Sequence, residues 1–369
     1  MHLLPLAAFL LLPLAWLEAQ KPPITWRIPE EPLLSLGSRD GLGPEVFGSV
    51  AGAVRLSSGI VIVADRKNLE LRSFSPTGKP LRTSGRKGSG PGEFQSMDPI
   101  QRCAGDSVFV YDRALFRISV FSPDGVFIRT ADVRKWSPNG LPPYDFWCNP
   151  AGILVFVQRS TEAPKGEGPF RQNMEITLVV RNDSVVSLGT FPSSERYVTG
   201  RQAFPRHLGK ETTVGVGEHS VYVGTADSFY VAEFSLRGER VNTLRERRAT
   251  IPVTSEGVSA YIKGHIASRG RRVSGTGYEE FLRELEWPKA YPAYGRLVVD
   301  GADNLWVQEF PIPGGEIRSW TIYAKSGAKI AVISLPKGLR LLEAGANYVL
   351  GVSQDEFDVD YVRVYALVK

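Results

Sequence analysis

The stretch Gly85-Arg86-Lys87-Gly88-Ser89-Gly90-Pro91-Gly92-Glu93-Phe94 separates two copies of one pattern. A Val-X-Asp-Arg segment and a Phe-Ser-Pro-X-Gly segment occur before this stretch and again after it. The spacing is constant at 47 residues for each matched pair, namely Asp65 and Asp112, Phe74 and Phe121, Gly78 and Gly125, and Arg82 and Arg129. A fixed period of about this length, carried by short β segments and glycine turns, is typical of the blades of a β-propeller.

More degenerate copies continue to the C-terminus, which makes about six units in all. The last copy begins at Tyr348 and stops about one strand early, so its final strand has to come from elsewhere. The segment Pro32-Leu33-Leu34-Ser35-Leu36 is an isolated strand candidate that would close the ring and leave no naked sheet edge. The sequence therefore predicts an all-β fold: a six-bladed β-propeller closed by an N-terminal strand, in a single domain over 32–369 after a lead-in at 20–31.

The N-terminus carries an apolar run over residues 1–19 that ends in a small residue, Ala19, before a polar one. This pattern predicts a signal peptide, and we expect an exported protein in the periplasm or outside the cell. No later stretch is long and apolar enough to span a bilayer.

Two cysteines, Cys103 and Cys148, occupy near-equivalent places at the ends of the first strands of consecutive units. In an oxidising compartment they either pair or remain two buried thiols, because neighbouring blades often hold such positions beyond the roughly 7 Å that a disulfide allows between Cα atoms. Two cysteines without nearby histidines do not make a metal site.

The charge balance is mildly basic, with a formal net charge of +5 and a pI near 9.1. Arginines cluster at positions 237, 240, 245, 247 and 248. The cluster is either the solvated edge of an outer strand or a patch for an acidic protein or an anionic envelope polymer. Export argues against nucleic acid as the partner.

Long insertions are confined to one side of the predicted disc. They occupy 159–174, 192–210, 254–290 and 311–319, all within second-to-third-strand or blade-to-blade connections, which share one rim. The segment 254–290 carries two helix-period stripes, around Tyr261 and Phe281. These helices either pack onto the disc or form a lid or docking ridge. Because ordered insertions cost chain entropy without extending the core, this rim is the candidate functional face.

The chain resembles six-bladed β-propellers of the NHL-repeat type, and more narrowly exported bacterial members of that group. The resemblance is carried by the 85–94 stretch and the strand ends at Asp65 and Asp112, and it is good over residues 44–133. Propellers of this type bind proteins, RNA or small molecules, and some are lyases or hydrolases. The resemblance therefore specifies the fold more closely than the function.

Polar residues are expected where the second strand of each unit ends, at Asp65, Asp112, Gln158, Thr225, Glu309 and Ser353. They would either surround the mouth or, as the Asp of NHL-like repeats commonly does, secure a turn. Arg66 and Arg113 follow two of them and would contact an anionic ligand or form exposed ion pairs. Tyr144, Tyr197 and Tyr294 are the aromatic residues predicted to bind a ligand at this rim, with core packing as the other interpretation.

No nucleophile–base pair, metal-ligand spacing or phosphate loop is present in the sequence. We expect a binding module without a cofactor or metal, whose partner is a protein, a peptide or an envelope glycan. The alternative is a lyase or hydrolase with Asp65, Asp112, His207 and Glu309 gathered at the mouth. A carboxylate pair with strongly shifted pKa values in one pocket would favour the enzyme, whereas an open apolar and aromatic surface would favour recognition.

Overall fold

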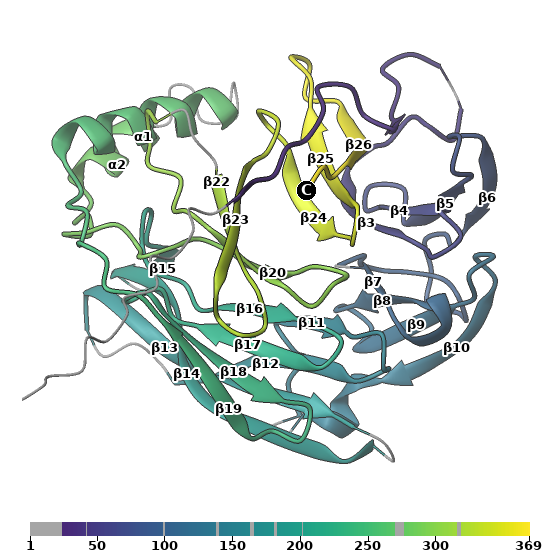
Figure 1. The fold of residues 1–369 in the computed structure, drawn as a ribbon, viewed down its shortest axis with the longest axis horizontal. Coiled ribbons are helices and arrows are strands. Elements are labelled where there is room, and N and C mark those ends of the chain that lie inside the picture. Colours follow the sequence, from purple (N-terminus) through teal and green to yellow (C-terminus); the bar gives the residue numbers. More distant parts are fainter. Residues whose placement is uncertain are drawn as a thin grey trace, which may run out of the picture.

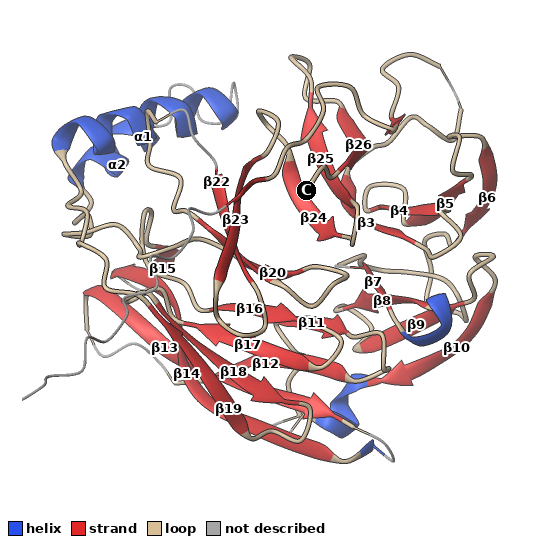
Figure 2. Ribbon diagram, in the orientation of Figure 1, coloured by secondary structure: helices blue, strands red, loops and turns tan. Residues whose placement is uncertain are grey.

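The computed structural model describes residues 24–369 apart from residues 42, 99, 138–139, 163–165, 181–182, 201, 270–276 and 316–318. The predicted signal peptide at 1–19 lies outside the described residues. Within them the protein is all-β, with two α-helices (Figures 1 and 2).

The described strands form six sheets, and the first four follow chain order. Sheet one consists of β3 (Val50–Arg55), β4 (Val61–Asp65), β5 (Glu70–Phe74) and β6 (Pro80–Ser84). Sheet two consists of β7 (Ile100–Arg102), β8 (Val108–Asp112), β9 (Arg117–Phe121) and β10 (Phe127–Asp132). Sheet three consists of β11 (Asp145–Cys148), β12 (Leu154–Arg159), β13 (Gly168–Val179), β14 (Val185–Thr199) and β15 (Gln202–Pro205). Sheet four consists of β16 (Thr213–Val216), β17 (Ser220–Gly224), β18 (Tyr230–Ser235) and β19 (Arg240–Arg245).

Sheets five and six each receive a strand from the N-terminal segment. Sheet five consists of β20 (Leu297–Val299), β21 (Leu305–Gln308), β22 (Ser319–Tyr323), β23 (Lys329–Ser334) and the parallel strand β1 (Ile24–Thr25). Sheet six consists of β24 (Arg340–Ala344), β25 (Tyr348–Gln354), β26 (Asp360–Ala366) and the antiparallel strand β2 (Leu34–Leu36). The isolated strand candidate at 32–36 therefore pairs with the last strand of the chain.

Buried side chains fill the space between each two neighbouring sheets. Each of six clusters among the described residues takes members from two sheets, for example Leu71 and Val108, Tyr111 and Phe156, Val157 and Val221, Val231 and Leu305, Trp320 and Val349, and Leu350 and Val61. Sheet one thus packs against both sheet two and sheet six, and β3 lies next to both β7 and β24. Burial on both faces explains the continuous apolar runs of second strands such as β4 and β8, in which every residue is buried.

The 47-residue repeat is visible in the turns of sheets one and two. Gly78, between β5 and β6, has φ +85°, and Gly125, between β9 and β10, has φ +74°. Glycine adopts this left-handed conformation without the steric cost of a side chain. A Cβ at Gly78 would lie 3.1 Å from Leu34 of β2, so this turn also packs against the N-terminal strand.

The insertions differ in kind from one sheet to another. The helical insertion is present as α1 (Ser255–Arg269) and α2 (Tyr278–Glu284), between β19 and β20. Much of the insertions predicted at 159–174 and 192–210 is strand, because β13 and β14 lengthen into one hairpin and β15 pairs with its end. Two short 3-10 helices, Ala104–Asp106 and Val133–Trp136, complete the described elements.

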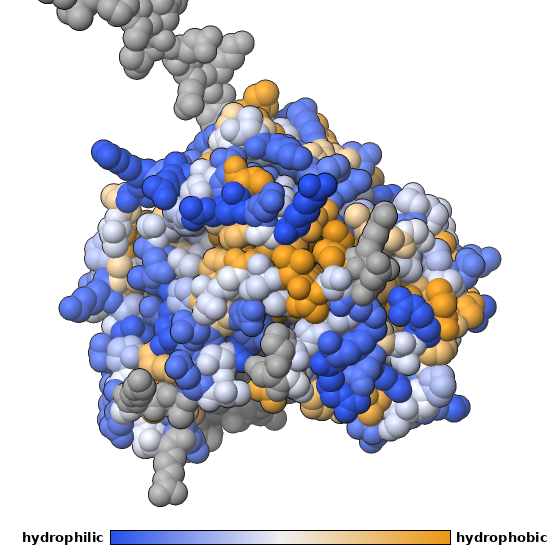
Figure 3. Space-filling model, turned by 90° about the horizontal axis from the view of Figure 1, so that it is seen from below, coloured by the Kyte–Doolittle hydropathy of each residue, from blue (hydrophilic) through white to orange (hydrophobic). Residues whose placement is uncertain are grey.

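The outer surface combines polar residues with scattered apolar ones. In the side view of Figure 3, apolar patches lie between hydrophilic areas. Several large exposed apolar side chains belong to outer strands or their turns, among them Leu81, Val126, Ile128, Val185 and Val241.

Candidate functional site

The carboxylates of the repeat, Asp65 and Asp112, are buried anchors for the backbone. Asp65 accepts hydrogen bonds from the amides of Gly48 (2.9 Å) and Ser49 (3.2 Å), and Asp112 accepts them from Gln95 (2.7 Å) and Ser96 (3.2 Å). Each pair of donors lies in the loop that leads into its sheet, and the two pairs are again 47 residues apart. Both side chains are fully buried.

The turn that follows each carboxylate is held in the same way. Asp65 accepts from the amide of Asn68 (3.3 Å), and Asp112 accepts from the amide of Leu115 (3.0 Å). Asp65 also lies 3.3 Å from a guanidinium nitrogen of Arg72. The oxygens of both carboxylates are therefore occupied by backbone and side-chain donors, which supports the turn-securing interpretation.

The other residues of the proposed catalytic set lie apart from these two. Glu309, at the end of sheet five's second strand, accepts from Arg248 (2.8 Å) and from Thr321 (2.9 Å). His207, which follows β15, has its Nδ1 2.8 Å from the Tyr261 hydroxyl of α1. The structure places Asp65, Asp112, Glu309 and His207 in four different local networks.

His207 belongs to a group of aromatic residues under the helices. The Tyr261 hydroxyl also lies 3.3 Å from Nδ1 of His265, whose Nε2 lies 3.2 Å from the Tyr278 hydroxyl. The ring of His207 packs beside those of Tyr261 and Trp287. These contacts connect α1 to α2 and to the loop after β15.

A central cavity of about 1110 Å³ runs along the first strands of all six sheets. Its wall includes Gly52 of β3, Gln101 of β7, Trp147 of β11, Gly215 of β16 and Leu342 of β24. None of the six polar residues predicted to surround the mouth, Asp65, Asp112, Gln158, Thr225, Glu309 and Ser353, is among the described residues of this wall. The first strand of each sheet is innermost, so these six residues lie farther out. The ends of two second strands still reach the wall, through Arg159 of β12 and Gln308 of β21.

The charged groups of the cavity mouth stand instead at the beginnings of the first strands. Asp145 is the first residue of β11 and Arg340 the first of β24, while Arg296 directly precedes β20 and Glu211 comes shortly before β16. The connections that lead into first strands include the helical insertion before β20, so this is the mouth on the insertion side. No single turn or sequence motif marks these residues, but their register at the start of each innermost strand would have identified them.

The protein around the cavity shifts the pKa values of these groups. Burial raises the pKa of Asp145 to about 6, although the Phe146 amide, Arg113 and Arg296 act in the opposite direction. Burial also raises the pKa of Glu211, against the charges of Arg159, Arg171 and Arg296. Glu211 and Arg296 line the cavity and are exposed to it. Protein nevertheless surrounds much of each side chain, and this disfavours the charged form of both groups.

The residues predicted to bind a ligand have different positions. Tyr144 lines the cavity, with the Arg159 guanidinium 3.4 Å from its ring centroid, and its carbonyl accepts a hydrogen bond of 2.6 Å from Arg113. Arg66 donates to the Met97 carbonyl at 3.0 Å.

The two remaining tyrosines belong to the packing of the fold. Tyr294 touches the cavity but is buried, and its hydroxyl donates to the Tyr230 carbonyl at 2.9 Å. Tyr197 lies in β14 opposite Pro169 and Phe204, outside the cavity wall. Tyr144 is thus the one of the three predicted tyrosines that presents an exposed ring to the cavity.

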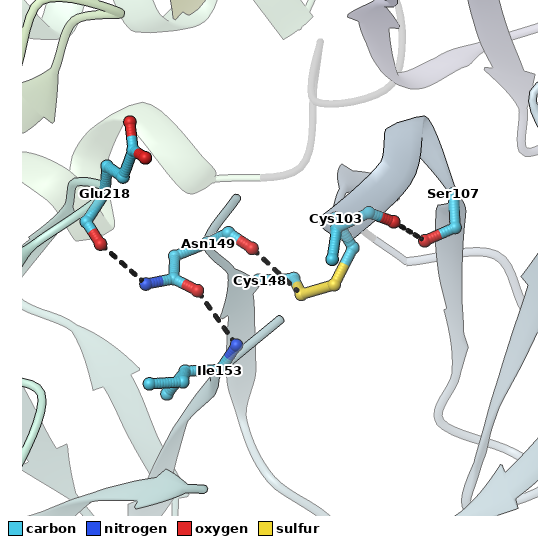
Figure 4. The surroundings of a disulfide bond; sticks show 7 residues. Cys103, Ser107, Cys148, Asn149, Ile153 and Glu218 are labelled. Atoms are coloured by element: carbon cyan, nitrogen blue, oxygen red, sulfur yellow. Dashed lines mark hydrogen bonds between the residues drawn. A yellow bond between two sulfur atoms is a disulfide. The ribbon is translucent and has the colours of Figure 1, made fainter. Parts of the chain in front are cut away.

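A disulfide joins the innermost strands of sheets two and three (Figure 4). Cys103 follows β7, Cys148 ends β11, and their Cα atoms are 5.2 Å apart. Next to it, the Asn149 side chain donates to the Glu218 carbonyl at 3.2 Å, which links sheet three to sheet four. Cys148 lines the cavity, so the cross-link is part of the cavity wall.

The described part of the chain lacks both a metal-binding cluster and a membrane-spanning helix. It contains no group of three or more His, Cys, Asp or Glu side chains able to hold a metal ion. It also contains no helix long and apolar enough to cross a membrane.

Comparison with known proteins gives a likeness of fold. No protein-family model and no curated protein sequence matches this chain. Its structure is similar to that of a member of the DUF4221 family from Bacteroides vulgatus, with a TM-score of 0.54 and 11% identity over 90% of this chain and 96% of that one. A candidate exported protein from Bacteroides fragilis (TM-score 0.49, 13% identity, 94% and 99% covered) and a gluconolactonase from Xanthomonas campestris (0.45, 9%, 95% and 99%) also match. At these identities the likeness to the first of these proteins extends to the fold alone.

Proposed function

We propose that the chain is an exported six-bladed propeller of the NHL type, in which the six sheets are blades and β2 closes the ring, and that it is a binding protein. Its binding site is the cavity mouth on the insertion side, and its ligand is a peptide, a protein segment or an envelope glycan. The observation that carries this proposal is the cavity itself: its insertion-side mouth combines water-accessible charged groups with the exposed ring of Tyr144. A concave site with a few converging polar groups is the usual form of a ligand site.

The positions of Asp65 and Asp112 favour a binding protein over an enzyme that would use these two carboxylates with His207 and Glu309. Asp65 and Asp112 are committed to backbone amides, and neither lines the cavity. A catalytic acid or base needs access to a substrate, which these two side chains lack in their buried positions.

One observation favours an enzyme as the second candidate. Asp145 and Glu211 line the same cavity, and burial raises the pKa of both. A carboxyl group with a pKa near neutrality is suited to general acid–base work. In that case Asp145 and Glu211 would be the catalytic pair of a lyase or hydrolase, in place of the residues predicted from the sequence.

The test is a titration of the protein spanning residues 20–369 against panels of peptides and of neutral and uronate-containing oligosaccharides. Hydrogen exchange then locates the bound ligand. We expect protection at the starts of β11, β16, β20 and β24. Tyr144→Ala should weaken binding, whereas Tyr197→Ala, a matched tyrosine outside the cavity wall, should not.

Three outcomes separate the candidates. Protection confined to outer strands, or equal effects of the two tyrosine variants, would contradict the cavity site. Conversion of a panel member by the wild type, lost in Asp145→Asn with binding retained, would replace the binding protein by the enzyme. Stable binding without conversion supports the binding protein.

A further inference from the structure

Two arginines of neighbouring sheets face the cavity from its insertion-side mouth. Arg296 precedes β20 and Arg340 begins β24. Nη1 of Arg296 donates a hydrogen bond of 2.8 Å to the carbonyl of Leu341, the residue after Arg340. This bond holds the Arg296 side chain across the gap between the two sheets, beside the backbone that carries Arg340.

The positive charges of this corner repel one another. The charge of Arg340 lowers the pKa of Arg296, second only to burial, and the charge of Arg66 acts on Arg340 in the same direction. Both Arg296 and Arg340 are accessible to water in the cavity. Like charges held close to one another repel, and a counter-charge that binds between them relieves this repulsion.

Carboxylates nearby do not supply a direct counter-charge. Among the described residues, neither Arg296 nor Arg340 forms an ion pair. Asp145 and Glu211 act on Arg296 only at longer range, and Asp360, which acts on Arg340, accepts hydrogen bonds from Val50 (2.7 Å) and Gln354 (3.0 Å).

The opposite mouth of the cavity is arranged differently. There Arg102 lies 3.7 Å from Asp106 and 3.9 Å from Glu343, and His219 lies 3.3 Å from Asp303. The insertion-side corner is therefore distinguished from the other mouth by cavity arginines without such direct pairs. An arginine's planar fork of donors matches the two oxygens of a carboxylate or phosphate.

We propose that Arg296 and Arg340 together bind the carboxylate or phosphate group of a ligand that enters the cavity from the insertion side. This inference rests on the proposed function, since it assigns a chemical class to the ligand of the same cavity. A volume of about 1110 Å³ accommodates a small organic anion or the end of a short chain. Arg66 stands near enough to Arg340 to add to the attraction.

The experiment is calorimetric titration of the protein spanning residues 20–369 with citrate, as a carboxylate probe, and with pyrophosphate, as a phosphate probe. Glycerol serves as the uncharged probe. Arg340→Gln removes one charge, and the Arg340 side chain makes no hydrogen bond among the described residues that this change would break. Arg340→Lys keeps the charge but loses the planar fork of donors. Arg129→Gln is the matched control, because Arg129 is an exposed arginine of the outer strand β10 and does not line the cavity.

We expect citrate or pyrophosphate to bind the wild type, and the affinity to fall about tenfold in Arg340→Gln, with Arg340→Lys in between and Arg129→Gln unchanged. Whichever probe binds more tightly identifies the group as carboxylate or phosphate. Thermal melting of each variant shows whether it is folded, and Arg340→Lys provides the comparison should Arg340→Gln be unstable.

Binding of neither anion by the wild type, or equal affinity in wild type and Arg340→Gln, would overturn the inference. A neutral panel ligand that protects the mouth equally in wild type and Arg340→Gln would overturn it as well, while leaving the proposed binding site intact. Conversely, citrate binding that depends on Arg340, with every panel ligand protecting outer strands, would support the anion site and remove the proposed peptide and glycan ligands.

Discussion

Two sets of carboxylates in this molecule have the same chemistry and opposite surroundings. Asp65 and Asp112 end second strands, are fully buried, and accept several hydrogen bonds each from backbone amides. Asp145 and Glu211 stand at the starts of first strands, face the cavity, and have raised pKa values because of burial. The first set stabilises the fold by accepting hydrogen bonds from the backbone, whereas the second set is held in a position that disfavours its charged form.

The difference shows that distance from the central cavity decides the role of a polar residue in this fold. One strand of displacement separates an Asp surrounded by amide donors from an Asp in contact with cavity water. Four predictions test this comparison.

The largest effect is expected from removing a repeat anchor. Asp112→Ala leaves the amides of Gln95, Ser96 and Leu115 without their acceptor in a buried site. We expect the free energy of unfolding to fall by about 3–5 kcal/mol. Equilibrium urea unfolding measures it, with Asp145→Asn as the cavity control. Equal losses in the two variants would abolish the distinction drawn between the two sets.

The cavity wall is expected to depend on its disulfide. Replacing both Cys103 and Cys148 by serine releases the link between β7 and β11. The free energy of unfolding should fall by about 2–4 kcal/mol, mainly because the unfolded chain regains entropy. Urea unfolding of the variant against the oxidised wild type measures the loss. Identical unfolding curves would mean that the packing of the two strands alone maintains this wall.

The turn glycines test whether the repeat is a backbone requirement. Gly125→Ala places a Cβ at φ +74°, 3.2 Å from Arg82 and 3.3 Å from Ser73, and should cost about 1–2 kcal/mol. Gly264→Ala, in α1 with open space around it, should instead stabilise by roughly 0.5–1 kcal/mol. Thermal melting compares the two variants. The same sign in both would contradict a positive-φ requirement at position 125.

The smallest effect concerns the pH dependence of Asp145. Its pKa is about 6 in the folded protein and about 3.8 in a free side chain, so the folded state binds the proton more tightly than the unfolded state does. Stability from this group is therefore present below about pH 4 and is lost as the pH rises towards 6. Asp145→Asn should raise the free energy of unfolding at pH 7.5 by about 1 kcal/mol, allowing for contact with water, and leave it nearly unchanged at pH 4.

The charged groups that act on Asp145 are Arg113, Arg296 and Asp98, and they remain in the variant. Urea unfolding at pH 4 and pH 7.5 separates the two regimes. A variant that is less stable at pH 7.5 would show that the attraction of the Arg113 and Arg296 charges for Asp145 outweighs the cost of its burial.

The repeat predicted the sheets well because strand alternation and glycine turns are local properties. The matched glycines, the pairing of 34–36 with the last unit and the helical insertion were all visible in the sequence. The site was predicted less well. The residues Asp145, Glu211, Arg296 and Arg340 belong to four different sheets and share only the central cavity, so no spacing along the chain relates them. The long hairpin β13–β14 was missed because the first half of β13 and most of β14 lack the continuous buried apolar run of strands such as β4 and β8.

The pairing of β2 with β26 bears on how the chain reaches its folded state. Leu34–Leu36 pairs with Asp360–Ala366, so this contact joins two segments that are far apart in the sequence. Contacts of such long sequence separation form slowly, since a large loop must close first. Until the C-terminal segment is available, β2 has no partner, and a chain shortened at either end would expose an unpaired strand edge that favours aggregation. The pairing of β2 with β26 can therefore form only after all of the chain between these two strands has been synthesised.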